Sequence, residues 1–251
     1  MNQDHFAKLD NPVWWALTGA QQSFSTGTAV AKRYQRGVLS FAAFDYTSPE
    51  NMNALDEWLE TGEVFFIIGM LPVLPPHWQL ITELPCVQMV LQQPVTNTLL
   101  QASVAPLTTA DPSETSIVSL TAADRNDMFN LVTKVQPGYY ELGTQQLGNY
   151  YGIRQQGQLV AIAGERIRLE GLTEVSAVCT DPAYTGRGYA QQLTAHICRA
   201  NLEQGITPFL HTLTTNERAI RLYEYLGFKQ RRVISFWKLM KGRRLPQKPA
   251  V

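Results

Sequence analysis

The chain has 251 residues, of which 45% are hydrophobic, and its 21 basic side chains are balanced by 21 acidic ones. A neutral chain has no overall field that attracts nucleic acid or an anionic membrane, so neither is expected as a partner. Three cysteines without metal-ligand spacing, no apolar leader and no membrane-length apolar run predict a protein of the reducing cytoplasm that holds no metal.

The first part of the chain predicts a small α+β domain without a recognisable catalytic cluster. A helix is expected over residues 10–25, because Asn11 stands as its N-cap and Pro12 at its first helical position. The next expected elements are a strand, a helix and a strand, at 37–46, 48–61 and 62–71.

The second part predicts a regular order of elements: strand, helix, three strands, helix, strand, helix, strand. Thr121 and Asp124 mark the start of its first helix. Gly205 ends the second helix, and Asn216 and Gly227 bound the third. The three strands in a row are separated by turn dipeptides and predict an antiparallel meander.

The fold class expected from these elements is α+β with a mixed sheet, in two domains. An N-terminal domain, a Pro-, Thr- and Ser-rich linker, a larger domain and a basic tail are assigned to 1–93, 94–115, 116–242 and 243–251.

Residues 181–193 contain a glycine-rich turn, DPAYTGRGYAQQL, that leads into a helix. Such a turn exposes backbone N–H groups at a helix N-terminus, where a diphosphate binds. The sequence is no P-loop, which needs Lys and then Ser or Thr after its last glycine. It is no dinucleotide fingerprint either, because Gln191 stands where that motif has Gly or Ala. The alternative is that Gly186 and Gly188 only form a tight turn.

Two segments together resemble the GNAT (GCN5-related N-acetyltransferase) superfamily. The signature R/Q-x-x-G-x-G/A is matched by the six residues TGRGYA, and a second family element by NERAIRLYEYLGF one strand later. The stretch TEVSAVCT is similar to a bacterial GNAT branch with an N-terminal extension domain. Thr185 departs from the signature, which has Arg or Gln there, and neighbouring Arg187 is expected to compensate.

The resemblance implies acetyl-CoA as cosubstrate, with its pyrophosphate on the glycine turn and its pantetheine arm along the main chain of Val178 and Thr180. It also implies a splay between the strand that holds these two residues and the strand at 206–214. The coenzyme-binding residues carried over are Val178, Cys179, Thr180, Thr185, Gly186, Arg187, Gly188, Tyr189, Ala190, Asn216 and Ala219.

The catalytic residues implied by the resemblance are Glu174 as the base and Tyr223 as the acid, with a backbone N–H near Val178 stabilising the oxyanion. Strand alternation puts Glu174 and Val178 on one face and Cys179 on the other. Two alternatives stay open for Glu174: a structural carboxylate bonded across the sheet, or a ligand of the substrate ammonium. The alternative for Tyr223 is a tyrosine of the hydrophobic core without a catalytic role. Cys179 is expected to be a buried cysteine rather than a covalent nucleophile.

Four residues are candidates for contact with the acceptor: Tyr139, Tyr140, Arg166 and His211. Tyr139 and Tyr140 either line the acceptor pocket or pack against the N-terminal domain. Arg166 pairs either with an acidic acceptor or with Glu174. His211 either contacts the acceptor or is a hydrogen-bonded structural histidine.

The predicted function is transfer of an acetyl group from acetyl-CoA to the amine of a small molecule or peptide, by direct attack on the thioester. The alternative is a CoA-binding protein without turnover. A third reading makes the N-terminal domain a docking platform, which exposure of Trp14 and Trp15 would support. The sequence leaves a homodimer open.

Overall fold

The computed structural model describes residues 3–92 and 116–243. The linker expected at 94–115 and all but the first residue of the expected basic tail lie outside these ranges. The chain forms two compact units. The first comprises Met1–Arg36, Ser40–Cys86 and Ile234–Val251, and the second Gly37–Leu39 and Val87–Val233. The units interleave along the chain, because the strands β5 (Trp78–Leu91) and β11 (Phe228–Lys241) each begin in one unit and end in the other.

The first unit contains short strands and mostly short helical segments. They are η1 (Gln3–Asp10), α1 (Pro12–Leu17), η2 (Gln22–Phe24), β1 (Ser25–Gly27), β2 (Ala31–Tyr34), β3 (Phe41–Phe44), η3 (Pro49–Trp58) and β4 (Val64–Ile68), where η marks a 3-10 helix. The strand order is β1-β2-β3-β4-β11, with β3 and β4 parallel and the other pairs antiparallel.

Two sequence expectations for this unit differ from the structure, and one long strand was not expected. The helix expected at 10–25 ends after Leu17, and the segment expected as a helix at 48–61 is a 3-10 helix. The long strand β5 was not expected, because Pro85 and the polar residues around it break the apolar alternation that predicts a strand. The strands expected at 37–46 and 62–71 are confirmed as β3 and β4.

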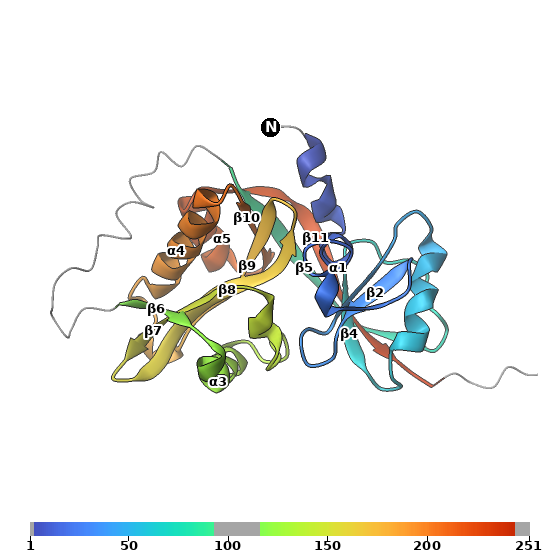
Figure 1. The fold of residues 1–251 in the computed structure, drawn as a ribbon, viewed down its shortest axis with the longest axis horizontal. Helices are drawn as coiled ribbons and strands as arrows, with labels where there is room; N and C mark the ends of the chain where they lie inside the picture. Colours follow the sequence, from blue (N-terminus) through green and yellow to red (C-terminus); the bar gives the residue numbers. More distant parts are fainter. Residues whose placement is uncertain (1–2, 93–115, 244–251) are drawn as a thin grey trace, which may run out of the picture. The chain divides into compact units, whose positions relative to one another are not determined.

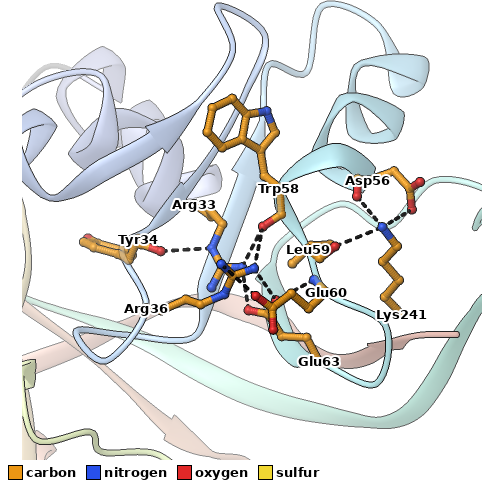
Figure 2. Close-up of polar contacts among 9 residues, drawn as sticks. All are labelled: Arg33, Tyr34, Arg36, Asp56, Trp58, Leu59, Glu60, Glu63 and Lys241. Atoms are coloured by element: carbon orange, nitrogen blue, oxygen red, sulfur yellow. Dashed lines mark hydrogen bonds and ion pairs between the residues drawn. The ribbon is translucent and has the colours of Figure 1, made fainter.

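Basic side chains satisfy the carbonyl groups at the end of η3 (Figure 2). Arg33 is buried, donates to the carbonyl of Trp58 at 3.0 Å and pairs with Glu63 at 2.5 Å. The ammonium of Lys241, on β11, donates to the carbonyl of Leu59 at 2.9 Å. Because the last carbonyls of a helix have no partner within the helix, these two cations fix where η3 stops.

The second unit contains the longer helices and most of the sheet. Its elements are β6 (Ile117–Leu120), η4 (Ala122–Asp124), α3 (Arg125–Val135), η5 (Thr144–Leu147), β7 (Tyr150–Gln155), β8 (Gln158–Leu169), β9 (Leu172–Thr180), η6 (Pro182–Tyr184), α4 (Tyr189–Glu203), β10 (Thr207–Leu213) and α5 (Glu217–Tyr225). The strand order is β5-β10-β9-β8-β7-β6, antiparallel from β6 to β9 and parallel between β9 and β10.

Helices cover both faces of this sheet (Figure 1). On β8, Ala161 and Ala163 pack in the cluster that contains α4 and α5, whereas Ile162 packs in the cluster that contains α3. Since successive strand residues point to opposite faces, α4 and α5 lie on one side of the sheet and α3 on the other.

The predicted ends of the helices in this unit are confirmed. Thr121 and Asp124 form a capping box before α3, and the side chain of Asn216 accepts from the backbone N–H of Ala219 at 3.1 Å. Gly227 follows α5 with a φ of +96°, a conformation that favours glycine. The predicted fold class, α+β with a mixed sheet, is confirmed as well.

Candidate active site

The site begins where β9 and β10 separate. The parallel register pairs Thr207–Phe209 with Leu172–Glu174 and goes no further. Beyond Glu174, this edge of β9 therefore has no strand partner among the described residues. Its free backbone groups can bind an extended ligand as an added strand would.

A bulge changes the direction of the side chains on β9. Ala177 has a φ of 52°, and the register with β8 shifts at this point. Val175 and Val178 pack in the same cluster, with α4, whereas Ala177 and Cys179 pack with α3. Because the bulge adds one residue, Glu174 shares a face with Cys179, and the expectation that it shares one with Val178 was wrong.

The glycine-rich turn connects η6 to α4. Gly186 and Gly188 have φ values of +81° and +77°, and Gly188 is the N-cap of α4. The first amides of α4 have no intrahelical partners and point out of its N-terminus. A Cβ on Gly186 would meet no heavy atom within 4 Å, so the turn faces open space.

These elements enclose a cavity of about 410 Å³. Its walls contain every coenzyme-binding residue expected from the sequence together with Tyr223. Five further residues line the cavity that were not expected from the sequence: Val135, Tyr184, Gln191, Arg218 and Leu222. Arg218 could have been found, since it lies between the expected Asn216 and Ala219.

Two arginines make the rim of this cavity cationic. The guanidinium of Arg187 lies 4.9 Å from the ring centroid of Tyr184, and Arg218 is exposed. The hydroxyl of Thr185 donates to the carbonyl of Pro182 at 3.1 Å. The side chain of Thr185 thus holds the turn, and the arginines supply the charge that an anionic ligand needs.

Tyr223 and Cys179 are both buried at this cavity and both stay protonated. Burial, with smaller contributions from Cys198 and Cys179, raises the pKa of Tyr223 above its ordinary value. Burial raises the pKa of the Cys179 thiol to about 12. Since a thiolate is the reactive form of cysteine, Cys179 is a poor nucleophile here, whereas the Tyr223 hydroxyl retains a proton to donate.

Glu174 is 1% exposed, and both of its carboxylate oxygens are engaged. Arg166 donates from Nε to Oε2 at 2.8 Å and from Nη2 to Oε1 at 2.7 Å. His211 Nδ1 lies 2.7 Å from Oε1. Burial alone would raise the pKa of Glu174, but the charge and hydrogen bonds of Arg166 and the hydrogen bond of His211 outweigh it and lower the pKa to about 2. These contacts support the alternative of a structural carboxylate bonded across the sheet.

The network continues from His211 to β5 and β11. The amide nitrogen of Gln88 lies 3.0 Å from His211 Nε2, and the amide oxygen of Gln88 accepts from Arg231 at 2.7 Å. Because the Gln88 nitrogen can only donate, His211 Nε2 accepts and its proton resides on Nδ1, facing Glu174. Gln88 was not identified from the sequence, since its strand was not expected.

The two tyrosines that were expected to contact the acceptor substrate lie in different surroundings. Tyr139 is exposed, whereas Tyr140 is buried beside Met128 in the cluster under α3. Arg166 and His211, the other expected acceptor contacts, both bind Glu174. None of these four residues lines the 410 Å³ cavity.

The described residues contain neither a metal-binding cluster nor a membrane-spanning helix. No group of three or more His, Cys, Asp or Glu residues in 3–92 and 116–243 is arranged to hold a metal ion. No helix in the same ranges combines the length and the apolar character that a bilayer crossing requires.

The chain is similar to known acetyltransferases in sequence and in structure. A family model described as FR47-like protein matches residues 150–237. The N-alpha-acetyltransferase RimI of Mycobacterium tuberculosis is 30% identical over 135 residues, which are 49% of this chain and 83% of that enzyme.

Solved structures extend the similarity to most of the chain. A crystal structure assigned to the GNAT family of acetyltransferases, from Novosphingobium aromaticivorans, has 33% identity and a TM-score of 0.80, and the match covers 94% of this chain and 99% of that one. A GCN5-related N-acetyltransferase from Kribbella flavida shares the fold at 15% identity and a TM-score of 0.56, over 93% and 95% of the two chains. The chain therefore belongs to the GNAT superfamily and is an acyltransferase of the acetyltransferase type.

Proposed function

We propose that this enzyme transfers the acetyl group of acetyl-CoA to an amine that attacks the thioester directly. The observation that carries the proposal is the cavity at the start of α4, with exposed amides and two arginines at its rim. A diphosphate fits backbone N–H groups at a helix N-terminus, and the open space at Gly186 leaves room for it.

The free edge of β9 supports a pantetheine arm bound along the main chain of Val178 and Thr180. Acetyl-CoA supplies the activated acetyl group. A backbone N–H near Val178 is proposed to stabilise the negative charge that develops on the carbonyl oxygen. The amine nitrogen forms the new bond to the carbonyl carbon as the bond from carbon to sulfur breaks.

Tyr223 is proposed to donate its hydroxyl proton to the departing sulfur. Its burial in the cavity wall and its raised pKa support this role, because the group is protonated at neutral pH. The hydroxyl regains its proton from solvent, and the amine gives its own to water.

An α-amino group is the acceptor class proposed for this site. Such a group has a pKa of about 8, so about a tenth of it is neutral at pH 7, whereas a lysine amine with a pKa of about 10.4 is almost fully protonated and needs a base. The expected base, Glu174, is held in an ion pair with Arg166. The name of the N-alpha-acetyltransferase relative agrees with an acceptor of this class.

Release of free thiol from acetyl-CoA by the full chain tests the proposal. We expect release with peptides that have a free N-terminus and none with the same peptides N-acetylated. Tyr223→Phe is expected to lower kcat about 100-fold. Tyr225→Phe, on the exposed side of the same helix, is the matched control and is expected to keep the full rate.

Coenzyme binding without thiol release over a wide amine panel would contradict the proposal and support the alternative of a CoA-binding protein. Release with lysine side chains but not with α-amines would contradict the acceptor class alone. An equal rate in Tyr223→Phe and Tyr225→Phe would remove the acid role.

A further inference from the structure

The first unit contains a cavity of about 440 Å³, apart from the site above and built differently. It is lined mainly by aromatic rings, with acidic and amide side chains beside them: Ala7, Asp10, Asn11, Trp14, Trp15, Asp45, Tyr46 and Thr47. We propose that this cavity binds an alkylammonium group, as carried by a lysine side chain or a free alkylamine.

The aromatic walls are held in place by the surrounding backbone. The hydroxyl of Tyr46 donates to the carbonyl of Ile68 and accepts from the N–H of Met70, both at 3.0 Å. A Cβ on Gly69 would come within 2.5 Å of the Tyr46 hydroxyl, so this chain segment closes against the ring. Trp14 is buried in α1. A cation that enters therefore meets rings that are already positioned, which reduces the entropic cost of binding.

The cavity also has the charge that a cation requires. The carboxylate of Asp45 is oriented by the N–H of Thr47, which donates to Oδ1 at 2.9 Å, and the Asp45 carbonyl accepts from Asn51 at 3.1 Å. No ion pair joins Asp45 to a basic side chain in the part of the chain that the structure describes. Asp10 adds a second carboxylate to the same wall.

The indole ring of Trp15 already has a cation over it. The ring is 44% exposed, and the ammonium of Lys8 lies 5.7 Å from its centroid. A cation within about 6 Å of an indole face is attracted by the ring quadrupole. The chain's own lysine thus makes with this ring the contact proposed for the ligand, although Lys8 itself does not line the cavity.

Asn11 anchors this wall of the cavity to the strand β3. Asn11 is 5% exposed, and its amide nitrogen donates to the carbonyl of Phe44 at 2.8 Å. Its amide oxygen has no hydrogen-bond partner within residues 3–92 and 116–243 and is inaccessible to solvent, so it takes no part in the proposed site.

The test is titration of the full chain with n-butylammonium chloride, followed by tryptophan fluorescence and by amide shifts in NMR spectra. We expect saturable shifts confined to the cavity segments, and none with 1-butanol, which has the same alkyl chain without the charge. Trp15→Leu and Asp45→Asn are each expected to weaken binding about tenfold. The asparagine keeps the oxygen that accepts from Thr47. Lys8→Met is expected to strengthen binding, because it removes a competing cation.

Trp58→Leu is the matched control, since Trp58 is 38% exposed in the same unit and does not line the cavity. Equal response to butanol and butylammonium would overturn the proposal, as would unchanged affinity in Trp15→Leu and Asp45→Asn variants that fold normally. Titration with a lysine-containing peptide then distinguishes the sources: tighter binding than butylammonium identifies a peptide, and weaker binding a free amine.

Discussion

Glu174 is the residue for which the sequence left the most roles open, and its neighbours support one of them. A carboxylate with a pKa near 2, bonded to Arg166 through both oxygens and to His211, has little tendency to take a proton from an amine. Its position on β9, between Arg166 on β8 and His211 on β10, joins three strands at the point where the sheet opens. We propose that it positions these strands.

Glu174→Gln is expected to destabilise the protein by about 3–5 kcal/mol, because it removes the carboxylate charge that pairs with the largely buried Arg166. The measurement is chemical denaturation, together with thiol release under conditions where the variant is folded. The double variant Glu174→Gln with Arg166→Met is expected to recover stability and activity together, since both charges are then absent. If stability returns and activity does not, Glu174 takes a direct part in the reaction.

At the scale of elements, the start of α4 depends on two glycines whose backbone conformation other residues avoid. The end of α4 offers a comparison, because Gly205 has a φ of +71° and no heavy atom within 4 Å of a built Cβ, as at Gly186. The two positions differ in what lies outside: Gly186 lines the cavity and Gly205 does not.

Gly186→Ala and Gly205→Ala are each expected to lower the free energy of unfolding by about 1–2 kcal/mol through the same backbone strain. Only Gly186→Ala is expected to weaken binding of CoA, about tenfold or more, because its methyl group projects into the cavity. Isothermal titration with CoA measures the affinities. Equal affinities in the two variants would mean that the turn does not contact the coenzyme.

At the scale of the whole molecule, each unit contains a buried carboxyl group whose pKa is lowered to about 2. This carboxyl group is Glu174 in the second unit and Asp56 in the first. Burial alone would raise the pKa of Asp56, but hydrogen bonds from Trp78 and His77 and the charge of Lys241 lower it to about 2. In unfolded chains these groups have pKa values near 4.

Both units are therefore expected to lose stability on acidification. A carboxyl group whose pKa is lowered by folding stabilises the folded state above its unfolded pKa, and this stability is lost as the pH falls toward 2. The free energy of unfolding is expected to decrease from about pH 5 to pH 2, as denaturation at each pH would measure. Asp56→Asn is expected to make this pH dependence shallower, and an unchanged slope would contradict the assignment.

The sequence by itself determined the features that neighbouring residues create. The caps at Thr121 and Asn216, the glycine turn before α4 and the order of elements in the second unit all follow from local hydrogen bonding and backbone preference. The family resemblance rested on the same short segments, which is why the residues expected at the cavity do line it.

Only the tertiary structure determined the features that depend on contacts between distant segments. The side-chain directions predicted for β9 from strict alternation were wrong beyond Ala177. The bulge at this residue depends on how β9 pairs with β8, which the sequence of β9 alone does not show. Glu174 has its low pKa because Arg166 and His211 reach it from neighbouring strands, and the cavity at Trp15 is formed by two separate segments of the first unit, 7–15 and 45–47. Long-range contacts of this kind leave no periodic signal in the sequence, since they depend on which strands and loops lie side by side.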